Sequence, residues 1–191
     1  NFQQEDGSYA PNPEGHAMLR RFDRGVTISW VYMFNHIQFI REVELHQNVQ
    51  AATIRYTVAG LADDESAKLN LHPMMTMRDF HALCDKVDAF EVQGHAGTAV
   101  VSRDGNDIHF ACEGSTFNTK CEWWYGIGYP MDAERGQGCK EDYFLPGHFT
   151  VDVLPGKVNT YELTVSLGAM PEVKTTRAKH LKPMRKALKD K

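Results

Sequence analysis

Hydrophobic and polar residues alternate along much of the chain. In residues 37–46, Ile37, Phe39 and Val43 fall on one face of an extended backbone, and residues 52–58 repeat the alternation. Successive side chains of a strand point to opposite faces of a sheet. The pattern therefore predicts strands that bury one face and expose the other.

A hairpin is predicted where two such runs surround a turn signal. Residues 99–103 and 108–112 are mainly apolar, and Asp104 and Gly105 lie between them. An Asp-Gly pair tolerates the positive φ angles of a tight two-residue turn, so it favours a hairpin.

Residues 149–154 and 161–167 predict a second hairpin, joined by a Pro-Gly turn. Helical signal is weak before residue 170, where only residues 78–86 are expected to hold a short helical turn. Residues 177–189 are expected to be helical, with a proline that kinks the helix or starts a new turn.

Many short strands separated by turn signals predict an all-β fold, an antiparallel β-sandwich, because a sheet buries its apolar face against a second layer. The sandwich is expected over residues 16–170. A loop or disordered segment is expected at 1–15, and a basic helical linker at 171–191. A length of 191 residues suits one such domain.

Charge is unevenly distributed, because residues 174–191 hold eight Lys or Arg and one Asp within a chain of net charge −4. This tail lacks interleaved aromatic residues, so it is interpreted as a solvated linker, and no nucleic-acid partner is expected. No apolar stretch is long enough to span a bilayer and no signal peptide is expected at the N-terminus, so no membrane partner is expected.

The cysteines and histidines show no ligand spacing. No C-x-x-C pair occurs among the four cysteines, which we interpret as reduced thiols of a cytoplasmic protein: Cys84, Cys112, Cys121 and Cys139. The nine histidines are scattered, and there is no glycine-rich phosphate loop. We therefore expect neither a metal nor a cofactor.

Arg78, Asp79 and His81 form a first candidate cluster. A guanidinium offers a planar fork of donors and a carboxylate accepts from hydroxyl groups, so the cluster can orient a ligand. The alternative is that Arg78 and Asp79 fix a tight turn through bonds to the backbone.

Trp123, Trp124 and Tyr125 form a second candidate, in a stretch punctuated by glycine. Their rings can form a platform for a sugar, or they can pack in the core or against another domain, since Trp and Tyr bury large areas and keep one polar group. Both interpretations remain open.

Residues 132–147 read as a long polar loop that contains Glu134, Arg135, Glu141 and Asp142. Two carboxylates that flank a glycosidic bond make an acid/base pair. Adjacent Glu141 and Asp142 are expected to face different ways, which makes them a poor pair. The favoured interpretation is that the acids pair with basic residues and brace the loop.

An ordered set of motifs resembles one known family, the N-terminal domain of bacterial and archaeal-type glycogen debranching enzymes (amylo-α-1,6-glucosidase). The motifs are the run 69–81, Trp124-Tyr125, Tyr129-Pro130, Glu134-Arg135-Gly136, Glu141-Asp142 and Pro146-Gly147-His148-Phe149, preceded by Trp30-Val31-Tyr32, Arg41-Glu42-Val43 and Ile54-Arg55-Tyr56.

The resemblance covers about residues 16–168 and implies a supersandwich that precedes an (α/α)6 catalytic barrel in the same polypeptide. It implies α-1,6 branch points of glycogen or a related α-glucan as substrate. The family's glycine-rich N-terminal segment and its barrel are not found here, so the sandwich is expected to be N-terminally truncated and to contain no catalytic residues of its own.

Three functions follow as hypotheses. The first is a non-catalytic domain that packs on and shapes the barrel, with the candidate residues facing the barrel or the sugar. The second is an independent carbohydrate-binding module for α-glucans. The third is a self-contained hydrolase that uses Asp79, Glu134 or Glu141, which is disfavoured because hydrolysis needs an acid and a base held across the bond.

Overall fold

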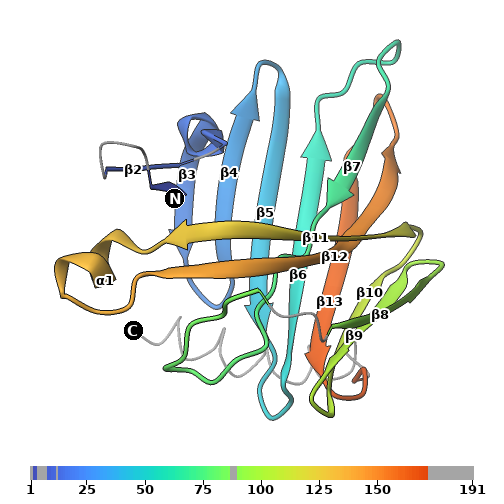
Figure 1. Ribbon diagram of the computed structural model, residues 1–191. Helices are drawn as coiled ribbons and strands as arrows, with labels where there is room; N and C mark the ends of the chain where they lie inside the picture. Colours follow the sequence, from blue (N-terminus) through green and yellow to red (C-terminus); the bar gives the residue numbers. More distant parts are fainter. Residues whose placement is uncertain (1, 4–7, 12, 87–89, 172–191) are drawn as a thin grey trace, which may run out of the picture.

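The computed structural model describes residues 2–3, 8–11, 13–86 and 90–171, which form two antiparallel sheets packed face to face (Figure 1). The larger sheet has the strand order β3-β4-β5-β6-β13-β10-β9-β8, and the smaller has the order β2-β1-β11-β12-β7. The predicted all-β antiparallel sandwich is confirmed.

The strands of the larger sheet are β3 (Leu19–Arg24), β4 (Ile28–Phe34), β5 (Ile37–Leu45), β6 (Ala51–Ala59), β8 (Glu91–His95), β9 (Thr98–Arg103), β10 (Asn106–Cys112) and β13 (Asn159–Leu167). Those of the smaller are β1 (Phe2–Gln3), β2 (Tyr9–Ala10), β7 (Ala67–Leu71), β11 (Thr116–Gly128) and β12 (Lys140–Val153). Two short helices, η1 (Gly15–Met18) and α1 (Pro130–Glu134), complete the described elements.

The hairpin predicted around Asp104 and Gly105 joins β9 to β10. Arg103 pairs with Asn106, so the turn has two residues, and φ is 50° at Asp104 and 75° at Gly105. Positive φ at both central positions gives the turn the twist of its strands. The alternating runs at 37–46 and 52–58 likewise form β5 and β6.

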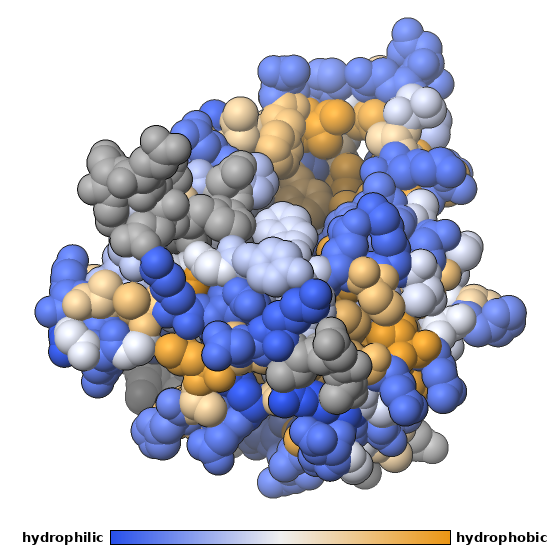
Figure 2. All heavy atoms as spheres, in the orientation of Figure 1, coloured by the Kyte–Doolittle hydropathy of each residue, from blue (hydrophilic) through white to orange (hydrophobic). Residues whose placement is uncertain are grey.

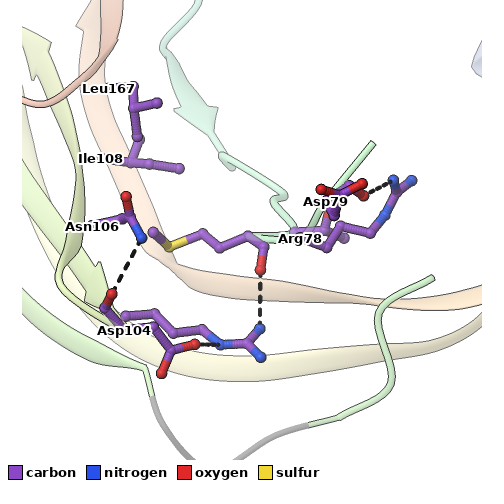
Figure 3. A pocket seen from close by; sticks show the side chains of 9 residues that line it. Arg78, Asp79, Asp104, Asn106, Ile108 and Leu167 are labelled. Carbon is purple, nitrogen blue, oxygen red and sulfur yellow. Dashed lines mark hydrogen bonds and ion pairs between the residues drawn. The ribbon is translucent and has the colours of Figure 1, made fainter. Parts of the chain in front are cut away.

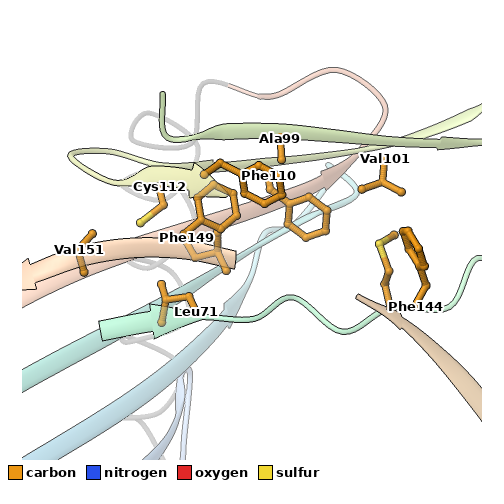
Figure 4. Packing of buried hydrophobic residues seen from close by; sticks show 11 residues of the cluster. Leu71, Ala99, Val101, Phe110, Cys112, Phe144, Phe149 and Val151 are labelled. Carbon is orange, nitrogen blue, oxygen red and sulfur yellow. The ribbon is translucent and has the colours of Figure 1, made fainter. Parts of the chain in front are cut away.

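The hydrophobic core lies where the long β11–β12 hairpin crosses the larger sheet (Figure 1). Phe149 of β12 is fully buried and its ring lies 4.8 Å from that of Phe117. Val101 and Phe110 meet them from the opposite sheet (Figure 4). Truncating a buried Phe to Ala costs about 3–5 kcal/mol, so this crossing provides a large share of the stability.

The outward side of β5, β6 and β13 carries a charged cross-strand network. Arg55 of β6 bonds Glu162 of β13 at 2.7 and 2.9 Å and Glu42 of β5 at 3.2 Å. Cross-strand pairs of opposite charge support a solvent-facing sheet surface.

Four predictions about local structure need correction. The runs at 149–154 and 161–167 form strands but not a hairpin, because β12 pairs with β11 and β7 in the smaller sheet, whereas β13 pairs with β6 and β10 in the larger. Residues 78–86 form a turn and irregular backbone rather than a helix, and 132–147 is not a loop, since it holds the end of α1 and the start of β12. The predicted loop at 1–15 contains β1, β2 and the start of η1. The predicted helical linker falls on residues 172–191, outside the described part.

In the part of the chain that is described, no helix has both the length and the apolar character needed to cross a membrane.

Candidate functional site

Five of the ten predicted site residues meet where residues 75–86, here called the edge segment, run along β12. Met75 and Phe144 exchange two backbone hydrogen bonds, of 3.0 and 2.9 Å. Farther along, the Asp142 N–H donates to the Cys84 carbonyl at 2.6 Å. The edge segment therefore continues the pairing of β12 beyond the end of β7.

An ion pair between Arg78 and Glu141 fixes the edge segment to β12. Arg78 Nε donates to Glu141 Oε2 at 2.7 Å, and Arg78 Nη2 donates to Oε1 at 3.0 Å. The Glu141 side chain has no solvent exposure, whereas that of Arg78 is 24% exposed. The Cys84 N–H and the Tyr129 hydroxyl also donate to this carboxylate. Such bidentate, charge-assisted bonds are the strongest hydrogen bonds in proteins.

The surroundings keep Glu141 ionised. Burial by itself raises the pKa of Glu141, but the hydrogen bonds from Arg78, Tyr129 and Cys84 outweigh it, and the net pKa is lowered. The hydrogen bond to Glu141 raises the pKa of Arg78, and burial followed by the bond to Glu141 raises that of Tyr129. A carboxylate that is buried, ionised and held by four donors is unsuited to transfer a proton.

The same guanidinium orders the exposed turn that follows it. Arg78 Nη1 donates to the carbonyls of Asp79 and Phe80, each at 3.1 Å, and the His81 N–H donates to Asp79 Oδ1 at 3.2 Å. These bonds hold Phe80 on the surface, where it is 86% exposed with its ring edge-on to that of His81. Arg78 and Asp79 thus make the backbone bonds of a tight turn.

Asp142 faces away from Glu141, as expected for neighbours in a strand. Its Oδ1 accepts from the Gly126 N–H at 2.8 Å and its Oδ2 from the Lys86 N–H at 3.1 Å. Gly126 lies in an irregular stretch of β11 with φ 64°, so Asp142 joins this bulge to the end of the edge segment.

The aromatic candidates divide between two environments. Trp123 packs into the core, with its ring 5.3 Å from Phe144 and 5.7 Å from Phe90. Trp124 and Tyr125, which are 36% and 55% exposed, lie on the surface beside the bulge. Of the three aromatic candidates, Trp124 and Tyr125 present their rings to solvent and Trp123 does not.

Glu134 and Arg135 lie apart from this network, at the exposed end of α1. The bracing contact expected between Arg135 and Glu134 or Asp142 is not formed in the described structure, because Asp142 is bound to backbone N–H groups instead. The structure therefore gives Arg135 no role in fixing the edge segment.

A cavity of about 500 Å³ opens beside the edge segment (Figure 3). Arg103 lines it, donating to the Met77 carbonyl at 3.2 Å and to Asp104 at 3.1 Å. Asn106 lies next to them, and Ile108 and Leu167 add apolar surface. The remaining lining residues are Thr76, Met77, Arg78, Asp79 and Asp104. Such a mixture of amide, carboxylate and guanidinium groups can bond the hydroxyls of a ligand.

The described residues contain no group of three or more His, Cys, Asp or Glu side chains arranged to hold a metal ion. The four cysteines are free thiols, with Cys84 and Cys112 buried and Cys121 exposed.

The sequence matches one family of known proteins, described as the N-terminal part of glycogen debranching enzyme, over residues 3–160. The chain belongs to this family. Its sandwich is thus that of a glycogen debranching enzyme N-terminal domain, and the expected resemblance is confirmed. No curated protein matches the chain.

Among solved structures, this debranching-family domain is similar to the heparan sulfate lyase HepC from Pedobacter heparinus, with a TM-score of 0.50 and 12% identity, over 78% of this chain and 21% of the lyase. A heparinase III gene product aligns with a TM-score of 0.43 and 15% identity, over 78% and 20% of the two chains. The likeness to HepC is one of fold. The chain spans about a fifth of the length of these proteins.

Several residues of the network were not predicted as site residues from the sequence. Tyr129 and Tyr143 share a hydrogen bond of 2.7 Å beneath Glu141, and Phe80 forms the exposed tip. Tyr129 and Phe80 lie inside motifs of the family, but local pattern does not distinguish a hydroxyl that binds a buried carboxylate from one that faces solvent.

Proposed function

We propose that this chain is a non-catalytic sandwich domain of a glycoside hydrolase that acts on α-1,6 branch points of glycogen-like α-glucans. In this proposal it packs on, and shapes, an (α/α)6 catalytic domain of the same polypeptide. Family membership supports the glycan class. The commitment of Glu141 to four donors supports a structural rather than a catalytic role.

The observation that carries the proposal is that Phe80 is exposed on a turn whose backbone is held by hydrogen bonds from Arg78 and to Asp79. Exposed aromatic side chains on ordered backbone are typical anchors of protein interfaces, because little conformational entropy is lost when they are buried. The Arg78–Glu141 pair supplies this order. Asp79 and His81 would form the rim around the anchor.

The test uses a polypeptide extended through the residues encoded after Lys191, assayed for glucose released from an α-1,6-branched limit dextrin. Phe80→Ala is expected to lower the activity at least tenfold while the sandwich remains folded. Val158→Ala, which truncates a side chain that is 71% exposed at the far β12–β13 turn, is the matched control. Equal activity of the two variants would contradict the proposal.

A reducing compartment fits the four free thiols, so the proposal places the protein in the cytoplasm. The proposal also places the protein in carbohydrate metabolism.

A carbohydrate-binding module is the second candidate function. The exposed rings of Trp124 and Tyr125 favour it, since sugars pack their C–H faces on aromatic surfaces. Titration with malto-oligosaccharides tests it: saturable heat that Trp124→Ala removes supports a module at β11, and unchanged heat contradicts that location.

A further inference from the structure

A groove of about 670 Å³ lies on the inward face of the larger sheet, and four aromatic residues line it. Trp30, Tyr32 and Phe34 alternate along β4, and Phe39 of β5 pairs directly with Tyr32. Figure 2 shows hydrophobic surface around a hollow over the upper parts of β5 and β6, beside the groove, whose lining comes from β4, β5 and the N-terminal segment. The groove's other walls come from the N-terminal segment, η1 and β3, and no residue of β11 or β12 lines it.

The rings are held in place by their neighbours. The Tyr32 ring lies 6.4 Å from Phe34 in a stacked arrangement and 6.1 Å from Phe39. The Arg41 guanidinium lies 5.1 Å above the ring of Trp30. Because packing already fixes these side chains, a ligand that covers them pays little in side-chain entropy.

The chemistry of the walls suits an uncharged sugar chain. Pyranose rings present apolar C–H faces that pack on aromatic rings, and their hydroxyls need donors and acceptors nearby. The Tyr32 hydroxyl, the Arg41 guanidinium and the His16 imidazole provide these groups. Among the described residues that line the groove there is no Asp or Glu, so this part of its wall offers no carboxylate to pair with a basic peptide or a metal ion.

The groove lies away from the proposed interface. In Figure 1 the β11–β12 pair separates the upper ends of β4 and β5, where the groove opens, from the edge segment below β12. A ligand in the groove would therefore leave Phe80 accessible to a catalytic domain. Successive rings along β4 are about 6.6 Å apart, two residues of strand rise, which allows one chain to contact more than one ring.

We propose that this aromatic groove binds a linear α-glucan chain, an outer branch of the polymer whose branch point is cleaved elsewhere. The identity of the ligand rests on the proposed glycan class, but the binding itself requires no catalytic domain. The groove would hold a large branched substrate close to the enzyme and raise its local concentration.

The experiment is affinity electrophoresis of the chain in gels that contain glycogen, with calorimetric titration of maltoheptaose. The chain is expected to be retarded, and Trp30→Ala to weaken binding about tenfold. Phe34→Ala, which truncates a ring that is already 42% exposed and should not disturb folding, is expected to weaken it several-fold. Leu154→Ala is the control, because it truncates a side chain that is 51% exposed and lies outside the groove, so binding should be unchanged. Tyr125→Ala tests the alternative location at β11.

Three results would overturn the proposal. The first is an unretarded wild-type chain. The second is binding that Tyr125→Ala removes and Phe34→Ala retains, which would locate the sugar at β11. The third is a wild-type dimer that Phe34→Ala converts to a monomer, while maltoheptaose leaves the oligomeric state of both unchanged. That result would make the groove a contact between two copies. None of these depends on the activity change measured for Phe80→Ala, so failure of this proposal is distinguishable from failure of the proposed function.

Discussion

Arg78 and Glu141, which are 63 positions apart in the sequence, form a fork-to-fork ion pair that fastens the edge segment to the second long strand of the hairpin. The carboxylate is fully buried and the guanidinium reaches solvent. The pair thus joins a core strand to an exposed turn, and removing either partner leaves the other without its main counter-charge.

Glu141→Gln is expected to destabilise the fold by about 3 kcal/mol, at the low end for a broken buried pair because Arg78 retains some contact with water. Chemical denaturation followed by tryptophan fluorescence measures the change. Asp152→Asn is the control on the same strand, since Asp152 and Lys68 are 3.7 Å apart and both exposed. Its effect should stay within about 0.5 kcal/mol. Equal losses of unfolding free energy in the two variants would show that the Arg78–Glu141 pair contributes nothing to stability.

Acid should remove the contribution of Glu141 selectively. The folded structure lowers the pKa of this carboxyl below its ordinary 4.5, so its stabilisation is complete above pH 4.5 and is lost as the pH falls through the folded pKa. The difference in unfolding free energy between the chain and Glu141→Gln should therefore shrink below pH 4.5. A difference that stays constant down to pH 3 would contradict the assignment.

Glu65 provides a comparison for this pH dependence. The Ala62 N–H, followed by His36, lowers the pKa of Glu65, but the carboxylate is 38% exposed and the hydrogen bonds compete with water. Glu65→Gln should change the acid limb of the stability curve much less than Glu141→Gln does.

The cysteines should react with a thiol reagent in an order set by burial. Burial raises the pKa of Cys84 and of Cys112, so the reactive thiolate of each is scarce as well as shielded. Cys121 is exposed and should be labelled first in the native protein. Peptide mass spectrometry after brief labelling checks the order, and Cys121→Ser should remove the fast phase. Rapid labelling of Cys112 without denaturant would contradict the packing described here.

Gly94 of β8 lies against the ring of Phe117, which occupies the space that a side chain at this position would need. A Cβ at this position would overlap that ring, so Gly94→Ala should destabilise the fold by about 1–3 kcal/mol through overpacking. Gly15→Ala is the control, because a Cβ there meets no atom within 4 Å. Thermal unfolding compares the two, and a Gly94 variant as stable as the Gly15 variant would refute this close approach.

The strands were predictable because the alternation of hydrophobic and polar residues can be read from neighbouring positions, and a half-buried sheet requires it. The turn at Asp104 and Gly105 was predictable for the same reason, since its backbone angles depend on those two residues. The start of β12 was not, because Lys140, Glu141 and Asp142 read as a polar loop. They form a strand because Arg78 and backbone N–H groups satisfy the carboxylates at its edge.

The candidate site was only partly predictable for a related reason. Arg78 and Asp79 were recognised as a cluster that can fix a turn, and they do so. Their partner is Glu141, 63 positions away, and no local periodicity encodes that pairing. The aromatic groove shows the same limit, since Tyr32 and Phe39 lie on different strands and become neighbours only through the register of β4 and β5.

The central claim is that this domain is not catalytic by itself. The most direct test measures the glucose that the chain alone releases from an α-1,6-branched limit dextrin, by mass spectrometry over a long incubation. We expect none above the buffer blank, because the candidate carboxylate Glu141 is occupied in holding the edge segment. Sustained release of glucose by the purified chain, abolished by a Glu141→Gln variant that remains folded, would contradict the account.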